Sequence, residues 1–251
     1  MSERPVVLIT GGSRGIGAAV ARLAASHRYH VAVNYRSDRA AAEQVVAACR
    51  EAGADAVAIA GDMAVEADVI GLFDQAEATL GRVSHVVNNA GVTGRSSPLA
   101  EAAAEVIRDA IDINVTGAIL VAREAARRLS TKRGGSGGSL VNISSVAAEI
   151  GSPGEYVWYA ASKGAIDALT IGLAKELAGE GVRVNAVSPG LIDTEIHALS
   201  TGDAGRVGRI APLIPMARVG RAEEIAEAVL FLIGEGASYI TGANVKVSGG
   251  R

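Results

Sequence analysis

The fold is decided by the stretch Val6-Val7-Leu8-Ile9-Thr10-Gly11-Gly12-Ser13-Arg14-Gly15-Ile16-Gly17, in which an apolar run enters a glycine-rich turn and then an amphipathic segment. Glycine lets the backbone turn tightly and approach a phosphate, and the first N–H groups of the next helix point at that anion. The spacing differs from the Gly-x-Gly-x-x-Gly dinucleotide fingerprint. Because the turn directly follows an apolar strand, a nucleotide site is favoured over a purely structural loop. The expected contacts are Gly11, Ser13, Arg14, Gly15, Ile16 and Gly17.

Strand-like and helix-like segments alternate along the rest of the chain. The short β-branched runs are apolar on both faces and suit a parallel sheet, and the longer amphipathic runs suit its crossover helices. The pattern predicts an α/β fold, a doubly wound Rossmann-type domain with a seven-stranded parallel sheet flanked by helices on both faces. The predicted strands are Val6–Thr10, His30–Tyr35, Ala56–Ala60, Val83–Asn88, Ser139–Ser144, Val182–Val187 and Ala243–Val247. The predicted helices are Ile16–Arg28, Asp38–Gly53, Glu66–Leu80, Ala100–Arg128 with a break near Asp109, Tyr156–Gly179 and Ala222–Gly234.

Two stretches depart from this alternation. Lys132–Gly138 is rich in glycine and is expected to be a flexible surface loop. A domain boundary there would separate residues that are expected to meet in one site, so residues 1–251 are expected to form a single domain. The long irregular stretch Asp193–Pro215 is expected to be a substrate lid, with an ordinary surface excursion as the alternative.

Composition excludes several classes of protein. Hydrophobic residues make up 49% of the chain and charged residues 20%, which excludes a disordered chain, and the net charge of −3 gives no basic surplus for nucleic acid. No apolar run approaches the ~20 residues of a membrane-spanning helix, and the first residues do not resemble a signal peptide. Because Cys49 is the single cysteine, no intramolecular disulfide can form. We therefore expect a cytoplasmic protein that binds neither nucleic acid nor membrane.

The end of the second predicted strand indicates which cofactor is preferred. An acid at this place would hold the ribose hydroxyl of NAD, but Asn34-Tyr35-Arg36-Ser37 contains none. Arg36 and Arg14 are both available to the additional phosphate of NADP, although either alone could be a solvated surface arginine. Together they predict NADP(H) as the preferred cofactor, with NAD(H) possible.

The next two strand ends carry further candidate contacts. Asp62, beside Met63, could hydrogen-bond adenine or could cap the following helix. Asn88-Asn89-Ala90-Gly91 has small residues that would let a cofactor lie against the backbone, although asparagine also stabilises turns. The cofactor-binding candidates here are Asp62, Met63, Asn89, Ala90 and Gly91.

Tyr159 and Lys163 form the candidate catalytic pair. Four residues apart on a predicted helix, they lie on one face, and the cation is expected to lower the tyrosine pKa from ~10. Tyr159 would then donate and accept protons near neutral pH. Tyr156, two turns from Lys163, is the poorer partner. Ser144 and Ser145 end the fifth strand, at the sheet edge where open α/β folds bind ligands.

Other catalytic chemistries have no support in the sequence. Neither Ser144 nor Ser145 stands in a Gly-x-Ser-x-Gly elbow that would make it a nucleophile. Its histidines are scattered and none has metal-ligand spacing, so no metal site is predicted. These histidines are His27, His30, His85 and His197.

These motifs, in this order and spacing, resemble the short-chain dehydrogenase/reductase family over roughly Val6–Gly250. The segment from Gly151 to Gly164 is similar to bacterial members that are called glucose 1-dehydrogenase-like or are oxidoreductases of unassigned substrate. The resemblance implies the strand order 3-2-1-4-5-6-7 and a homotetramer built as a dimer of dimers. Trp158 departs from the family pattern and is expected to narrow the substrate pocket or to face a neighbouring subunit.

The resemblance also implies a role for each site residue. Tyr159 would be the acid/base, and Lys163 would lower its pKa and hold the nicotinamide ribose. Ser145 would polarise the substrate carbonyl, and is preferred to Ser144 because the family's serine ends an Asn-x-x-Ser stretch. Asn114 matches an asparagine that holds a water in a proton relay to the lysine. The segment around the nicotinamide carboxamide corresponds to Pro189, Gly190, Ile192 and Thr194.

The expected function is that of an NADP(H)-dependent oxidoreductase that transfers a hydride between nicotinamide and a small carbonyl or alcohol substrate. The substrate could be a sugar, a 3-oxoacyl thioester or another ketone. A non-catalytic dinucleotide-binding sensor on the same fold is the alternative, since a fold does not determine function. The joint presence of Asn114, Ser145, Tyr159 and Lys163 favours the enzyme.

Overall fold

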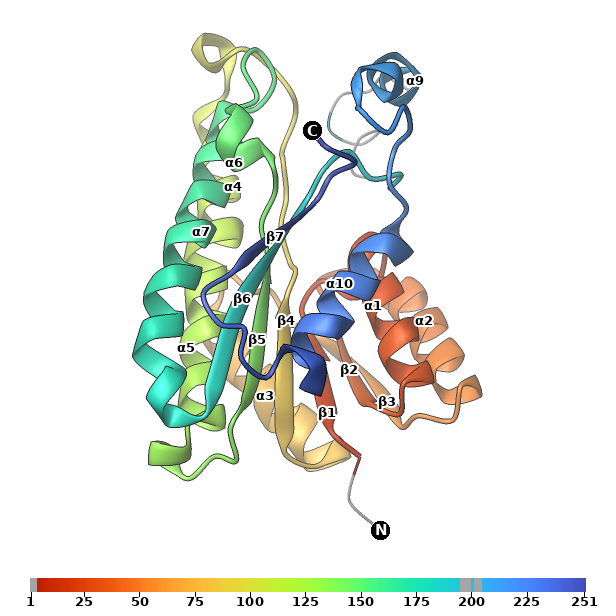
Figure 1. Cartoon of the computed structure of the whole chain (residues 1–251), viewed down its shortest axis with the longest axis vertical. Coiled ribbons are helices and arrows are strands. Elements are labelled where there is room, and N and C mark those ends of the chain that lie inside the picture. Colours follow the sequence, from red (N-terminus) through yellow and green to blue (C-terminus); the bar gives the residue numbers. More distant parts are fainter. Residues whose placement is uncertain (1–3, 195–199, 201–204) are drawn as a thin grey trace.

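A computed structural model describes residues 4–194, 200 and 205–251. They form a seven-stranded sheet of order β3-β2-β1-β4-β5-β6-β7, in which every neighbouring pair is parallel (Figure 1). The predicted fold class and strand order are thereby confirmed. The strands are β1 Val6–Ile9, β2 His30–Tyr35, β3 Ala56–Ala60, β4 Val83–Asn88, β5 Gly138–Ile143, β6 Val182–Pro189 and β7 Asn244–Val247.

Helices cover both faces of this sheet because successive strand residues point to opposite sides. Val7 and Ile9 pack in one core with α1, α2 and α10, whereas Val6 and Leu8 pack in a second core with α3, α5 and α7. Both faces of the sheet are apolar, as expected for a sheet that helices cover on both sides. The helices are α1 Gly15–Ser26, α2 Arg39–Glu51, α3 Glu66–Leu80, α5 Ala118–Leu129, α7 Val157–Leu177 and α10 Ala222–Ile233.

The helical stretch predicted over Ala100–Arg128, with a break near Asp109, is interrupted slightly later, at Asp112. The segment is divided into a short turn at Leu99–Glu101, helix α4 at Ala104–Ile111, a π-helical turn at Asp112–Gly117, and α5. A Cβ atom at Gly117 would lie 2.8 Å from the Met63 carbonyl oxygen, so the chain must pass close to the loop after β3 at this point. Two short helices, α6 at Ala147–Ile150 and α9 at Arg206–Ile210, were not predicted.

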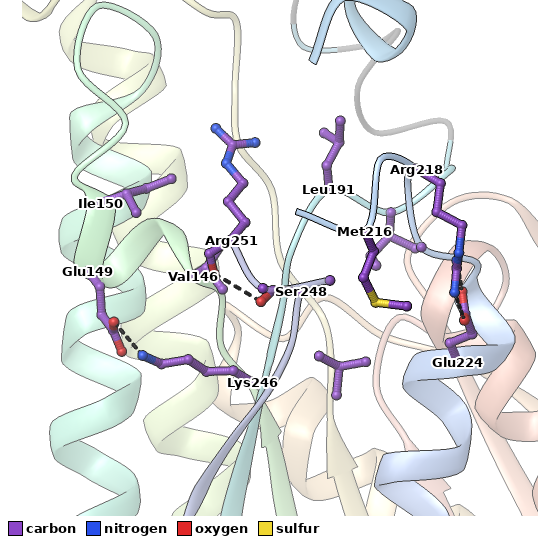
Figure 2. A pocket seen from close by; sticks show the side chains of 15 residues that line it. Val146, Glu149, Ile150, Leu191, Met216, Arg218, Glu224, Lys246, Ser248 and Arg251 are labelled. Atoms are coloured by element: carbon purple, nitrogen blue, oxygen red, sulfur yellow. Dashed lines mark hydrogen bonds and ion pairs between the residues drawn. The ribbon is translucent and has the colours of Figure 1, made fainter. Parts of the chain in front are cut away.

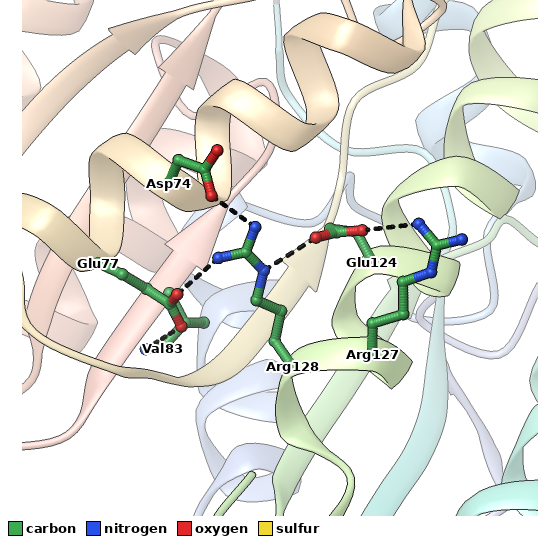
Figure 3. A network of polar contacts seen from close by, with 6 residues as sticks. All are labelled: Asp74, Glu77, Val83, Glu124, Arg127 and Arg128. Atoms are coloured by element: carbon green, nitrogen blue, oxygen red, sulfur yellow. Dashed lines mark hydrogen bonds and ion pairs between the residues drawn. The ribbon is translucent and has the colours of Figure 1, made fainter. Parts of the chain in front are cut away.

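Helices α3 and α5 are joined by an ion-pair network centred on Arg128, shown in Figure 3. Its guanidinium donates to Asp74 at 2.6 Å, to Glu77 at 2.7 Å and to Glu124 at 2.8 Å. The Arg128 side chain is only 21% exposed, so these charge-assisted bonds are less screened than ordinary surface pairs. The network fastens the two helices on one side of the sheet.

The substrate lid predicted over Asp193–Pro215 lies partly outside the described residues, which omit 195–199 and 201–204. Its described part contains Ser200, α9 and a short turn at Ala211–Leu213. Ser96 donates its backbone N–H to the Ser200 carbonyl at 2.9 Å, so this part of the segment is attached to the chain that follows β4.

The loop Lys132–Gly138, which the sequence predicts to be a flexible surface loop, is held in place by several backbone hydrogen bonds. The N–H groups of Gly135 and Gly137 donate to Ser130 and Leu129 at 2.8 Å each, and Gly138 donates to Gly181 at 3.0 Å. Gly138 has a φ of +144°, and a Cβ atom there would lie 1.9 Å from the Ser84 carbonyl oxygen. Glycine is therefore required where the loop enters β5.

We predict that Gly138→Ala lowers the free energy of unfolding by at least about 2 kcal/mol, because both the dihedral angle and the Ser84 contact must change. Gly134→Ala is the matched control, since Gly134 also has a positive φ but no atom within 4 Å of an added Cβ. It should cost about 1 kcal/mol. Urea denaturation measures both, and equal losses would contradict the steric argument.

Candidate active site

The predicted site residues surround one cavity of about 1060 Å³ at the carboxyl ends of the strands. Two of them, Gly17 and Asn114, do not line it. The parallel arrangement explains the gathering, because parallel strands all end at the same edge of the sheet. The predicted residues that line the cavity are Gly11, Ser13, Arg14, Gly15, Ile16, Asn34, Tyr35, Arg36, Ser37, Asp62, Met63, Asn89, Ala90, Gly91, Ser145, Tyr159, Lys163, Pro189, Gly190, Ile192 and Thr194.

The glycine-rich turn is shaped by backbone conformations that favour glycine. Gly11 and Gly15 have φ values of +60° and +52°. A Cβ atom at Gly17 would lie 2.5 Å from the Gly11 carbonyl oxygen, so this glycine lets the start of α1 close onto the turn. Gly17 therefore contributes to the shape of the turn and is not exposed to the cavity.

Asn34 holds the same turn from β2. It is buried, its Oδ1 accepts a hydrogen bond from Gly11 N–H at 3.1 Å, and its Nδ2 donates to the Gly61 carbonyl at 3.0 Å. Its amide thus links the turn to the loop after β3. The side chain was predicted as a cofactor contact, and the structure shows it engaged with the protein backbone.

Thr10 and Asn89 fasten the turn to the end of β4. The Thr10 hydroxyl oxygen accepts hydrogen bonds from Asn89 N–H at 2.9 Å and Ala90 N–H at 3.0 Å. The Asn89 side-chain amide donates to the carbonyls of Thr10 at 2.9 Å and Gly11 at 3.0 Å. Sequence reasoning missed Thr10, although a hydroxyl at the end of an otherwise apolar strand was a usable signal.

At one end of the cavity, each arginine lies near a carboxylate. Arg14 is 3.8 Å from Asp38, and Arg36 is 3.9 Å from Asp62. Asp38 also caps α2 by accepting the Ala41 N–H at 3.0 Å. Asp62 accepts the N–H of Ala64, so its carboxylate shapes the local turn and still lies beside Arg36. This end of the cavity therefore carries two arginine–aspartate pairs.

At the other end, Tyr159 meets Ser145 and Lys163. The Lys163 Nζ lies 5.6 Å from the centre of the Tyr159 ring and donates to the Ile143 carbonyl at 2.7 Å. Interaction with the Ser145 side chain counteracts part of the rise in the pKa of Tyr159 that burial causes. Ser144 is buried and donates to the Asp167 carboxylate at 2.6 Å. Of the two serines, Ser145 therefore faces the tyrosine.

The expected lowering of the Tyr159 pKa is wrong for the protein without ligand. Burial raises the pKa of Tyr159 to about 12, and the hydrogen bond to Ser145 opposes this only in part. Burial also lowers the pKa of Lys163 to about 8, against the attraction of Asp167. Both shifts have the same cause, because a buried site disfavours the charged form of each group. The lysine cation does not outweigh this burial.

Asn114 lies in the π-helical turn, with its side chain fully engaged. Its Oδ1 accepts the Val92 N–H at 2.8 Å, and its Nδ2 donates to the Val92 carbonyl at 2.7 Å and to Ser162 at 3.0 Å. The amide thus fixes the chain after β4 against α7. A proton relay through this residue would have to use its main chain.

Trp158 does not line the cavity, so it does not narrow the pocket. It is buried against Ala110, and its indole N–H donates to the Thr93 carbonyl at 2.9 Å. Because the Trp158 side chain is packed inside the protein, it does not make the expected contact with a neighbouring subunit either. It anchors α7 to the segment after β4.

Sequence reasoning also missed a buried ion pair near Tyr159. Arg206 of α9 forms a paired contact with Glu155 and donates to the Tyr156 hydroxyl at 2.9 Å. The Tyr156 ring meets the Tyr159 ring edge-on, with centres 5.6 Å apart. Arg206 holds the pKa of Glu155 below its usual range through these hydrogen bonds. No local pattern pointed to this pair, because its members are 51 residues apart.

We predict that Thr10→Val lowers the free energy of unfolding by roughly 2–4 kcal/mol. The change leaves the N–H groups of Asn89 and Ala90 without their acceptor, and each unsatisfied buried donor costs about 1–3 kcal/mol. Thr10→Ser keeps the oxygen and should retain most of the stability. Chemical denaturation compares the two, and equal losses would show that the methyl group, not the hydroxyl, matters.

Comparison with known proteins agrees with this geometry. A family model described as enoyl-(acyl carrier protein) reductase matches residues 11–251. The uncharacterized oxidoreductase YgfF of Escherichia coli is 47% identical over 98% of this chain and 99% of that protein. The structure of a 3-ketoacyl-(acyl-carrier-protein) reductase from Brucella melitensis complexed with NADH has a TM-score of 0.90 and 31% identity, covering 98% of both chains. A blue fluorescent protein from a metagenomic library in complex with NADPH has a TM-score of 0.89 and 35% identity, covering 98% and 97%. The chain belongs to the short-chain dehydrogenase/reductase family.

Proposed function

We propose that this oxidoreductase interconverts a small carbonyl compound and its alcohol with NADP(H), using Tyr159 as the acid/base. The observation that carries the proposal is the meeting of Tyr159, Ser145 and Lys163 at one end of the cavity whose other end holds Arg14 and Arg36. A single elongated ligand could touch both ends. A nicotinamide dinucleotide has this form, and structural neighbours in complex with NADH and NADPH support it.

The residues present fit such a cofactor. Gly15 has no side chain, and a Cβ atom there would lie 3.5 Å from the Thr194 methyl group, so glycine keeps the cavity open between α1 and the segment after β6. The N-terminus of α1 is directed at this space, where its amide groups would bind the pyrophosphate. Lys163 would hold the nicotinamide ribose, and Pro189 and Thr194 would lie by the carboxamide.

Tyr159 would move the proton. When bound, the cofactor supplies or accepts the hydride at the substrate carbon. With its pKa at about 12, Tyr159 is protonated at neutral pH and ready to donate to a carbonyl oxygen during reduction. In the reverse direction it must accept a proton as phenolate, a form that the Ser145 hydrogen bond and the nearby Lys163 cation both favour. Ser145 would also donate to the substrate oxygen and steady it.

We predict that Tyr159→Phe lowers kcat by on the order of a hundredfold to ten-thousandfold while cofactor binding is largely kept, because it removes the transferable proton and little volume. Tyr156→Phe is the control, since that hydroxyl receives its hydrogen bond from Arg206, and its effect should be mild. Reductase assays over a carbonyl panel and cofactor titrations measure both. Reversed effects would overturn the assignment, and a wild type that binds cofactor without turnover would indicate a sensor.

The preference for NADP(H) is proposed from Arg36 and Arg14. A phosphate on the adenosine ribose could receive a charge-assisted hydrogen bond from each, with a further one from Ser37. Asp62 and Asp38 already lie near these arginines, and their partial neutralisation of the site leaves room for NAD(H) as a weaker ligand.

We predict that Arg36→Ala weakens NADP binding roughly tenfold or more and NAD binding much less, because one charge-assisted bond to the phosphate is lost. Arg39→Ala is the matched control, as Arg39 is exposed on α2, pairs with Glu43 and does not line the cavity. Fluorescence titration gives Kd for each cofactor. Parallel losses for NAD and NADP would show that Arg36 does not contact the phosphate.

The assembly that the family resemblance suggests is a homotetramer, and the helix surfaces are compatible with it. Ile119 on α5 and Ile171 on α7 are exposed, and a Cβ atom added at Gly164 or Gly172 would meet nothing within 4 Å. Such open, apolar helix surfaces permit close packing with a second copy. The segment Ala237–Gly250, with the fully exposed Tyr239, is the proposed second contact.

We predict a tetramer in solution, and that Ile171→Glu reduces it to smaller species because a charge would be buried at the contact. Val65→Glu is the control, since Val65 at the start of α3 is similarly exposed but lies elsewhere. Light scattering at micromolar concentration measures the mass. A monomeric wild type would contradict the assembly.

Two smaller expectations remain proposals. Within the predicted substrate lid, the proposal now rests on residues 205–215. There α9 lies beside the cavity, and its Arg206 is paired with Glu155. A cytoplasmic location is proposed because Cys49 is the single cysteine, so that no intramolecular disulfide can form. Cys49 is buried, and burial raises its pKa to about 11. No helix in the described part of the chain is long and apolar enough to cross a membrane.

A further inference from the structure

The main cavity borders a second cavity of about 650 Å³, whose lining is shown in Figure 2. The two share an apolar wall made by Val146, Ile150 and Leu191. Arg251 lines both, and in the view of Figure 2 its side chain points away from the strands, between Ile150 and Leu191. The Ser248 hydroxyl donates to the Arg251 carbonyl oxygen at 2.9 Å and so holds its backbone.

The side-chain carboxylates near the border between the two cavities are already paired with cations other than Arg251. Glu149 accepts from Lys246 at 2.6 Å, as Figure 2 shows, and Glu155 is paired with Arg206.

On the far side of the second cavity, Arg218 donates to both oxygens of Glu224, at 2.8 and 2.6 Å. The Arg251 guanidinium, by contrast, has no hydrogen bond or ion pair with any residue that the structure describes. At the border between the two cavities, Arg251 is therefore a charged side chain without a partner among the described residues.

This charge acts on the wall beside the catalytic tyrosine. The pKa of Glu155 is lowered mainly by its hydrogen bonds to Arg206, with a smaller contribution from Arg251, and Arg251 also opposes the rise that burial causes in the pKa of Tyr156. Tyr156 in turn contacts Tyr159. An anionic group at Arg251 and a carbonyl at Tyr159 can be parts of one molecule, because both residues line the main cavity together with the shared apolar residues.

We infer that Arg251 is a specificity residue that binds an anionic group on the substrate, a carboxylate or a phosphate ester, joined by a short hydrocarbon chain to the reacting carbonyl. Val146, Ile150 and Leu191 take the hydrocarbon, and the guanidinium offers a planar fork that suits either anion. The inference rests on the proposed carbonyl chemistry at Tyr159, and names the class of substrate for it.

Arg95 is the competing candidate. It is exposed and lines the main cavity from the segment after β4, but it does not border the second cavity or its apolar wall. Its position therefore offers a charge without the hydrocarbon surface that a chain between anion and carbonyl would cover. The two arginines make different predictions when each is changed alone.

The test compares matched charged and neutral ketones with NADPH as reductant. The pairs are levulinate with methyl levulinate, the next two longer linear oxo acids with their methyl esters, and dihydroxyacetone phosphate with dihydroxyacetone. The variants are Arg251→Gln, Arg95→Gln and, as the paired-arginine control, Arg218→Gln. We expect wild type to favour at least one charged member in kcat/KM by about tenfold or more. Arg251→Gln should reduce kcat/KM for that member at least tenfold more than for its neutral partner.

The oxo acids and the phosphate ester distinguish which anion is bound. Equal use of charged and neutral members by wild type, or a charge preference that survives Arg251→Gln or is lost only in Arg95→Gln, would overturn the inference. Calorimetric titration of the same compounds into the NADP⁺-loaded protein separates this from failure of the proposed function. Binding of a charged member without turnover would sustain the Arg251 site and refute the activity, whereas neither binding nor turnover of any charged member would refute the site.

Discussion

The hydrogen bonds between Thr10 and the end of β4 are the interaction on which the rest of the site depends. They join β1 to β4, the two central strands, at the point where the glycine-rich turn leaves the sheet. The Asn89 side chain donates two further hydrogen bonds to carbonyl groups of the turn, and the Asn34 side chain, from β2, accepts one from the Gly11 N–H. With the turn fixed in this way, α1 begins at a defined angle and directs its first amide groups at the cavity.

Burial determines the chemistry at the far end of this cavity. The same low-polarity surroundings raise the pKa of Tyr159 and lower that of Lys163, so both groups are biased toward their neutral forms. A neutral tyrosine is a proton donor, which suits reduction of a carbonyl. In the mechanism proposed above, the reverse reaction needs the phenolate, which Ser145 and the charged form of Lys163 would stabilise.

Charge is distributed along the cavity in pairs. Arg14 and Arg36 each lie near an aspartate at one end, and Arg206 is held by Glu155 beside the tyrosines. Such pairing lets several arginines line a single cavity without strong mutual repulsion. A cation without a protein partner among the described residues, such as Arg251 or Arg95, is then available to a ligand.

The sequence by itself predicted the strands, their parallel pairing and which motifs would gather at one edge, because alternation of apolar runs and glycine-rich turns is a local property. The order of the strands in the sheet was predicted from the family resemblance and not from this pattern. The tertiary structure decided the rest. It placed Ser145 toward Tyr159 and Ser144 toward Asp167, although the two serines are neighbours in the chain.

It also fixed where the predicted helical stretch Ala100–Arg128 is interrupted, at a π-helical turn over Asp112–Gly117, where the chain approaches Met63 and Asn114 is bonded to Val92. The direction of the Tyr159 pKa likewise followed from burial, which a spacing of four residues does not reveal. Contacts between residues far apart in the chain, such as Arg206 with Glu155, leave no periodic signal, and only folding brings them together.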